Sequence, residues 1–179
     1  MKPITLKLSG LQSYREMQQI DFDELCQMGL FGIFGPTGSG KSTLLDAMTL
    51  ALYGKVERAV NGTQGIMNHS EDALYVSFTF ELSSADGPKR YRVERRFKRT
   101  NELSVSNTVS RFIEVTAEGE AVMADKLAEV TRCVEDKIGL KMEDFTRAVV
   151  LPQGKFAEFL SLKGSERRQM LQRLFHLEK

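Results

Sequence analysis

Residues 35–43 read Gly-Pro-Thr-Gly-Ser-Gly-Lys-Ser-Thr, and this stretch decides the fold. It fits the pattern G-x-x-x-x-G-K-[ST] at every fixed position. Glycines let the backbone turn tightly, so that successive N–H groups point inward around a phosphate chain. Lys41 would add a positive charge near the β- and γ-phosphates, and the Ser42 hydroxyl is placed to bind Mg²⁺. We therefore predict a nucleoside triphosphate site formed by Gly35, Pro36, Thr37, Gly38, Ser39, Gly40, Lys41, Ser42 and Thr43.

The residues on either side of this stretch favour a nucleotide site over the alternative, which is a glycine-rich turn with an incidental lysine. The apolar run at 30–34 before it is typical of a buried strand. After it, apolar residues recur at helical spacing up to Tyr53, and Gly54 is a helix-stop signal. The positive end of that helix would point at the same anion as the loop. Short strands predicted earlier, at 4–8 and 20–22, argue against a simple nucleotide-kinase layout.

Composition leaves the class of partner open. The chain has 179 residues, of which 41% are hydrophobic and 27% charged, as expected for one soluble globular domain. A net charge of +1 argues neither for nor against a polyanionic partner. Cys26 and Cys133 lie far apart in no metal-like spacing, which favours a reduced cytoplasmic compartment. Because no long apolar run is present, we expect no membrane span.

The middle of the chain predicts an antiparallel meander between residues 74 and 116. Residues 74–82 alternate strictly between apolar and other side chains, and Asp86-Gly87-Pro88 is a turn signal. Residues 90–98 alternate again, except that Arg95 interrupts the apolar side. A turn at Thr100-Asn101 precedes a third strand at 111–116.

One face of the strand at 90–98 carries a basic stripe, which we define as Arg90, Arg92, Arg96 and Lys98, with Arg99 beside it. One interpretation is a solvated strand face. The other is a contact surface for the DNA backbone, and it gains weight because acidic partners on that face are expected to be few. Each cation used in this way would steepen the salt dependence of DNA affinity by nearly one unit of log–log slope.

The C-terminal part of the chain predicts further helices and one polar site residue. Residues 124–138 have an apolar stripe of Leu127, Val130, Val134 and Ile138, and Gly139 ends this helix. Residues 145–154 lead from a helix end through an apolar strand into a loop that contains Gln153. Ligands of open α/β sheets bind at such strand ends, although an ordinary turn glutamine is the alternative. From Lys163 onward the pattern is again helical.

Half of the chemistry of an ATPase is missing from the sequence. A phosphate-loop ATPase needs an apolar run that ends in an acidic residue, which holds Mg²⁺ and polarises water. No such run occurs, and no Leu-Ser-Gly-Gly stretch is present. We therefore expect the chain alone to be inactive in hydrolysis, with the rest supplied downstream or by a partner.

Taken together, three stretches resemble the SbcC family, the ATPase subunits of bacterial SbcCD nucleases and relatives of SMC proteins. They are the loop at 35–43, the helix residues Asp46-Ala47 and Ala51–Gly54, and residues 145–160, Phe-Thr-Arg-Ala-Val-Val-Leu-Pro-Gln-Gly-Lys-Phe-Ala-Glu-Phe-Leu. The resemblance implies an α/β fold: the N-terminal half of a phosphate-loop, ABC/SMC-type ATPase head with an antiparallel β meander. Residues 1–160 would form that lobe, and residues 161–179 would begin a coiled-coil arm.

The resemblance also implies a mechanism and partners. The lobe would combine with its own C-terminal lobe, and two such heads would enclose ATP and Mg²⁺ between them. The dimer would bind DNA and control the SbcD nuclease, which acts on DNA ends and hairpins. Lys41 and Gln153 would be the catalytic residues, and Ser42 and Gln153 would reach the metal. Residues 12–15 lie in the region of the base and ribose contacts but match no fixed motif.

Two other functions remain open from the sequence. A transporter ATPase subunit would also carry this loop, with its signature motif following soon after the glutamine. A DNA-binding module whose nucleotide loop only regulates folding is the non-enzymatic alternative.

Overall fold

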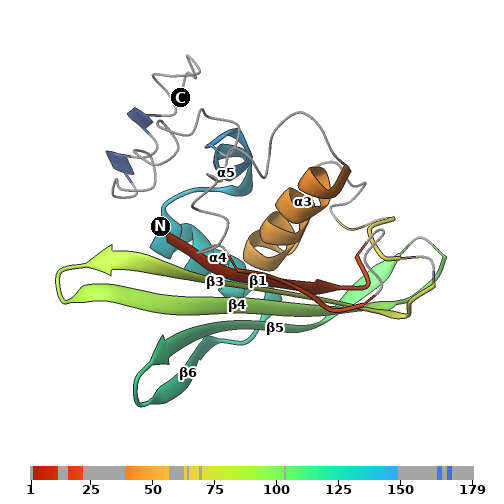
Figure 1. Ribbon diagram of the computed structural model, residues 1–179, viewed down its shortest axis with the longest axis horizontal. Coiled ribbons are helices and arrows are strands. Elements are labelled where there is room, and N and C mark those ends of the chain that lie inside the picture. The colour runs from red at the N-terminus through yellow and green to blue at the C-terminus, as the bar shows by residue number, and fades with distance from the viewer. Residues whose placement is uncertain are drawn as a thin grey trace.

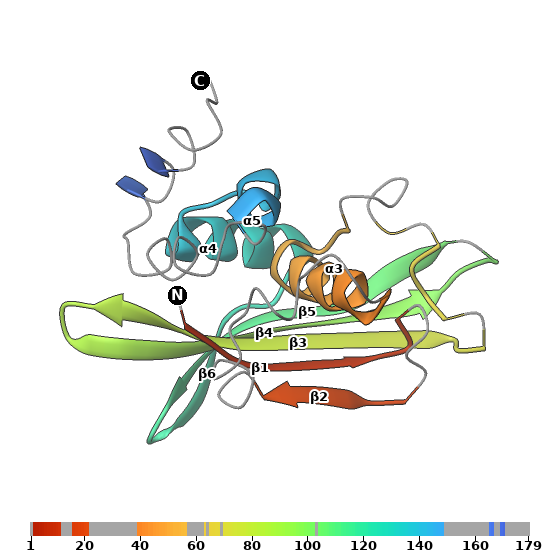
Figure 2. The same ribbon diagram turned by 45° about the horizontal axis from the view of Figure 1, so that its top comes forward.

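The computed structural model describes residues 2–11, 16–21, 39–56, 63, 65–68, 70–102, 104–148, 165–166 and 169–170. Among these residues, three helices lie on one face of a sheet, and the other face of the sheet points away from them (Figures 1 and 2). These helices are α3 (Ser39–Tyr53), α4 (Leu127–Ile138) and α5 (Met142–Ala148). This arrangement confirms the predicted α/β class.

In the described part of the chain the sheet has six strands in the order β2-β1-β3-β4-β5-β6, and all neighbours are antiparallel. The predicted meander is confirmed, and its first two strands are joined by a short turn at 85–86. The first strand of the chain also joins this sheet, beside β3. The strands are β1 (Lys2–Ser9), β2 (Gln18–Asp21), β3 (Ala73–Ser84), β4 (Gly87–Arg99), β5 (Val105–Thr116) and β6 (Gly119–Ala124).

The alternating pattern of the strands builds the core. Register places Leu6 beside Phe78, Phe78 beside Val93, and Val93 beside Phe112. All four side chains are fully buried on the helix-covered side of the sheet. Burying a side chain of this size stabilises the fold by about 1.5–3 kcal/mol. This row therefore holds four strands in one register, because a slip by one residue would turn every apolar side chain outward.

Several boundaries differ from the predictions, since β5 begins at Val105 and not at residue 111, and the first two strands are also shifted or longer. Strand β6 was not predicted, because its apolar residues Val122 and Met123 are both exposed and show no buried alternation. The following helix therefore begins at Leu127 and not at residue 124. Leu127 is 47% exposed, so its place on the buried stripe was wrong, whereas Val130 and the rest of the stripe are buried. Gly139 ends the helix with a φ of 80°, as predicted.

Other predictions lie outside the described residues. These are the strand at 30–34, the loop residues 35–38, the strand leading to 151, Gln153, and most of the arm from 161 onward. In the part of the chain that is described, no helix combines the length and the apolar character needed to cross a membrane.

Gly54, at the end of α3, offers a test of this packing. Its φ is 76°, and an added Cβ would lie 3.0 Å from Nη1 of Arg95 and 3.2 Å from a methyl carbon of Leu127. Gly65 has a similar φ of 78°, but nothing lies within 4 Å of its added Cβ. We expect Gly65→Ala to lower the free energy of unfolding by about 1–2 kcal/mol through the backbone alone. Gly54→Ala should lose a further ~1–3 kcal/mol through overpacking. Denaturant unfolding measures the free energy of unfolding of both variants. An equal decrease in the two variants would contradict the crowding at Gly54.

Candidate nucleotide-binding site

The second half of the predicted phosphate loop forms the start of α3. The backbone of residues 39–43 is helical, so α3 begins inside the stretch 35–43. Gly35, Pro36, Thr37, Gly38 and Gln153 lie outside the described residues. The first N–H groups of a helix have no acceptor within the helix. No acidic residue lies in the first turn of α3 to offset its positive end. This end of the helix therefore suits an anion such as a triphosphate.

The opposite, negative end of α3 is held by Arg95 of β4. The last turn of α3 itself has no basic residue. Arg95 donates from Nε to the Ala51 carbonyl at 2.9 Å and from Nη2 to the Leu52 carbonyl at 3.0 Å. Arg95 is fully buried, and burial lowers its pKa to about 10. The guanidinium therefore stays protonated at neutral pH, where a cation at a helix C-terminus is favourable.

Arg95 also joins α3 to β5 and α4. Its Nη1 donates to the Ser110 hydroxyl at 3.1 Å, and its Nη2 donates to the Thr131 hydroxyl at 3.0 Å. Thr131 Oγ1 lies 3.3 Å from the Tyr53 carbonyl and 3.1 Å from that of Leu127, and its single hydrogen is shared between these two acceptors. The Gly54 N–H donates to the carbonyl of Leu50 at 2.9 Å. All of the last four carbonyls of α3, which lack partners in an isolated helix, thus have a donor within reach.

Tyr53 ties the same end of α3 to the segment that follows α4. Its hydroxyl donates to the Leu140 carbonyl at 2.9 Å, and its ring centroid lies 6.1 Å from that of Phe145 in α5. Contacts from β4, α4 and α5 therefore fix the direction of the helix that begins at the phosphate loop. In the sequence, Arg95 stands out only as an interruption of the apolar side of its strand. A charged residue at an inward-facing position was the signal that it is paired in the core.

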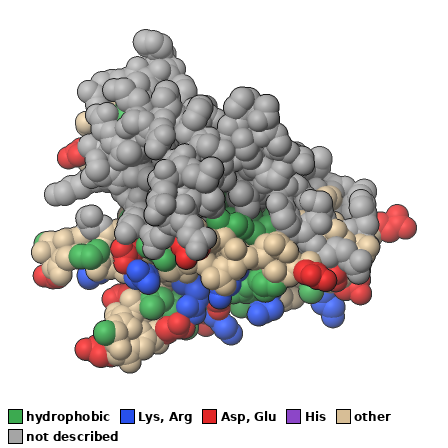
Figure 3. Space-filling view, viewed as in Figure 1, with side chains coloured by type: hydrophobic (Ala, Val, Ile, Leu, Met, Phe, Trp, Pro, Cys, Tyr) green, Lys and Arg blue, Asp and Glu red, His purple; other side chains and the backbone are tan. Residues whose placement is uncertain are grey.

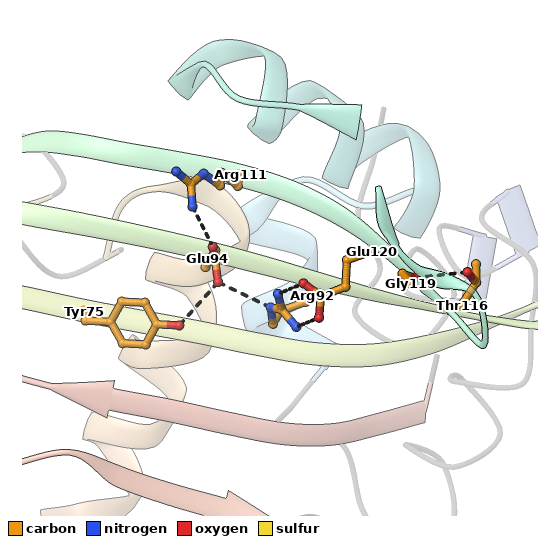
Figure 4. A network of polar contacts seen from close by, with 7 residues as sticks. All are labelled: Tyr75, Arg92, Glu94, Arg111, Thr116, Gly119 and Glu120. Atoms are coloured by element: carbon orange, nitrogen blue, oxygen red, sulfur yellow. Dashed lines mark hydrogen bonds and ion pairs between the residues drawn. The ribbon is translucent and has the colours of Figure 1, made fainter. Parts of the chain in front are cut away.

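Two of the four cations of the basic stripe are paired with carboxylates, which corrects the expectation that its acidic partners are few. Arg90 donates to Glu81 at 2.9 Å. Arg92 donates to Glu120 at 2.6 Å and to Glu94 at 3.3 Å (Figure 4). Glu81 lies opposite Arg90 in the neighbouring strand, and Glu120 comes from the unpredicted β6. The expectation was wrong because cross-strand neighbours depend on register, which the sequence pattern of one strand does not contain.

Two cations of the stripe keep a different environment. Arg96 and Lys98 are exposed, and in the described parts of the chain neither forms an ion pair. The guanidinium carbon of Arg96 lies 4.5 Å from the centroid of the Tyr75 ring. Arg99 serves the fold, since it donates to the carbonyls of Asn68, Glu71 and Glu102. On the outer side of the sheet, basic and acidic side chains are accordingly mixed (Figure 3).

Residues 5–179 match the family model described as an AAA domain. The chain belongs to the AAA domain family. This AAA domain is also similar to curated proteins named as the SbcC component of the nuclease SbcCD. The protein from Bacillus subtilis is 65% identical over 178 residues, which cover 99% of this chain and 16% of that protein. The one from Clostridium acetobutylicum is 48% identical over 179 residues, covering 99% and 15%.

A third relative of this AAA domain, from Aquifex aeolicus, is named probable DNA double-strand break repair Rad50 ATPase. It is 36% identical over 180 residues, covering 99% of this chain and 17% of that protein. These relatives confirm the resemblance to SbcC, of whose length the chain spans about a sixth. A solved SMC head domain from Thermotoga maritima aligns with 74% of this chain and 42% of its own at 20% identity. Its TM-score of 0.36 is below the range that indicates a shared fold.

The ion pair between Arg92 and Glu120 gives a pH prediction. The hydrogen bond from Arg92 lowers the pKa of the Glu120 carboxyl below its ordinary value of 4.5. The folded state thus favours the carboxylate. The resulting stability is present above pH 4.5 and is lost as the pH falls through the folded pKa. Carboxyl ¹³C NMR should show this lowered pKa, and Arg92→Gln should return it to the ordinary value. Arg90→Gln, which removes a different ion pair, should leave it lowered, and an ordinary pKa in the unmodified protein would contradict the bridge.

Proposed function

We propose that this chain is the ATP-binding N-terminal lobe of an SbcC-type DNA repair ATPase. The observation that carries the proposal is that α3 begins inside the stretch 35–43, at Ser39, with no acidic residue in its first turn. A loop of this sequence that leads directly into a helix is the arrangement that captures phosphates. The similarity to SbcC proteins of the SbcCD nuclease over 99% of the chain supports the same assignment.

In this proposal residues 35–43 hold the triphosphate. Lys41 offsets the charge of the β- and γ-phosphates, and Ser42 ligates Mg²⁺. Gln153 reaches the same metal and orients the attacking water. The bound ATP supplies the phosphoanhydride bond that is hydrolysed, while the chain contributes binding, orientation and charge. The acidic residue that polarises water belongs to a part of the protein outside this chain, so hydrolysis requires the C-terminal lobe.

The remaining partners follow from the same proposal. The chain spans 16% of the length of its Bacillus subtilis relative, which leaves room for a C-terminal lobe and a coiled-coil arm. ATP-dependent engagement of a second head, followed by release after hydrolysis, would control the SbcD nuclease on DNA ends and hairpins. The site of action would be the cytoplasm. The names of the relatives, a nuclease component and a repair ATPase, disfavour the transporter alternative.

Substitution of Lys41 tests the nucleotide site. In the full-length protein, Lys41→Ala should raise the Kd for MgATP on the order of a hundredfold, because a charge-assisted contact to phosphate is lost. Lys55→Ala is the matched control, since Lys55 is exposed beyond the end of α3. Calorimetry measures both variants. Unchanged binding in Lys41→Ala would refute the assignment.

The ion pairs of the outer face reduce the number of cations of the basic stripe that are available to contact DNA. Arg96 and Lys98 are the cations of the stripe without a carboxylate partner in the described residues. We expect the double variant Arg96→Gln with Lys98→Gln to lower the log–log salt slope of DNA binding by about two. The control is Arg90→Gln with Arg92→Gln, which should change the slope less because these cations are already paired. The slope is obtained from the DNA affinity of the full-length protein over a series of salt concentrations. Equal changes of slope in both double variants would contradict the distinction between paired and unpaired cations.

A further inference from the structure

We propose that Arg95 is a positioning residue for the nucleotide site, one that acts on the phosphate loop from the far end of α3. The inference rests on the proposed function, since it concerns the same site. Arg95 does not touch the phosphate-binding end, because a helix of 15 residues separates the two by roughly 22 Å. Its influence passes through α3 as a rigid element. Fixing the C-terminal end of that helix fixes the direction in which its first N–H groups point.

The contacts of Arg95 require a guanidinium. The side chain donates to four acceptors on three elements, namely two carbonyls of α3, Ser110 on β5 and Thr131 on α4. The planar fork of arginine presents its donors in different directions, whereas a lysine has one nitrogen at a single point. A lysine buried here would also lose its proton more readily, because burial disfavours the charged form. The arginine therefore supplies both the geometry and a lasting charge.

The acceptors around Arg95 are themselves oriented. The Ser110 hydroxyl donates to Oδ1 of Asn107 at 2.8 Å, which leaves its lone pairs to accept from Arg95. The Thr131 hydroxyl accepts from Arg95, and its single hydrogen is shared between the carbonyl of Leu127 at 3.1 Å and that of Tyr53 at 3.3 Å. Such chains polarise one another and are stronger than isolated bonds. They also connect α4 directly to the helix of the phosphate loop.

The surroundings leave little room for another arrangement. Gly54 lies against the guanidinium so closely that even a methyl group would come within 3.0 Å of Nη1. Neither end of α3 carries a charged residue of its own that would complement its dipole. The helix therefore depends on Arg95 at one end and, in the proposed function, on the triphosphate at the other. A shift of α4 against the sheet would be transmitted through these contacts and along α3 to the helical residues 39–43 of the phosphate-binding stretch.

The experiment compares Arg95→Met and Arg95→Lys with a control that loses stability in the core without removing a hydrogen bond to α3. Phe80→Leu is that control, because Phe80 is a core residue packed on Phe78 and Tyr91. In the full-length protein, Arg95→Met should raise the Kd for MgATP about tenfold, a usual size for coupling between sites. Arg95→Met should also speed amide hydrogen exchange along α3. Arg95→Lys should bring neither the Kd nor the exchange rate back to the value of the unmodified protein. Phe80→Leu should change both only as far as its lower global stability requires.

A Kd within about twofold of the unmodified protein, with α3 exchange equal to that of the control, would overturn the proposal. If Arg95→Met does not fold, Thr131→Val removes a single hydroxyl and should give the same two changes at smaller size. If the unmodified protein binds no MgATP, the proposed function is wrong. The exchange measurement then still decides whether Arg95 positions α3.

Discussion

A buried guanidinium that holds the carbonyl end of α3 is the interaction on which the rest of the structure depends. Removing Arg95 from water carries a desolvation penalty, which is offset by its hydrogen bonds and by the negative end of the helix dipole. Without it, the carbonyls of Ala51 and Leu52 would be buried without donors, and each unsatisfied group destabilises by about 1–3 kcal/mol. The same side chain joins β4, β5, α3 and α4, so the covered face of the sheet and its helices are fixed together.

The two ends of α3 therefore have different surroundings. The end at Tyr53 is anchored in the core, whereas the end at Ser39 continues the glycine-rich stretch and carries no acidic residue. On the outer face of the sheet, by contrast, the described residues Arg90, Arg92 and Arg111 form ion pairs with carboxylates of the sheet strands. Those pairs are partly exposed and of modest strength, but they reduce the charge available to a polyanion. Within the basic stripe, any electrostatic attraction of DNA is therefore concentrated at Arg96 and Lys98.

The features that could be predicted from the sequence are those set by local patterns. Alternation predicted β3 and β4, helical spacing predicted α3, and glycines with positive φ end α3 and α4 where expected. The features that could not be predicted depend on residues far apart in the chain. Strand β6 has exposed apolar residues, the partner of Arg92 comes from that strand, and the partners of Arg95 lie on three other elements. The motif at 35–43 and the stretch at 145–160 were enough to indicate the family, because they are defined by residue type and spacing alone.

The most direct test of the account is ¹⁵N NMR of the arginine side chains at neutral pH. If Arg95 is buried and donates to Ala51, its Nε–H should give a resolved signal that exchanges slowly with water, with a detectable coupling across the hydrogen bond to that carbonyl. The exposed Arg132 on α4 serves as the reference for free exchange. An Arg95 Nε–H that exchanges as fast as that of Arg132 would contradict the account.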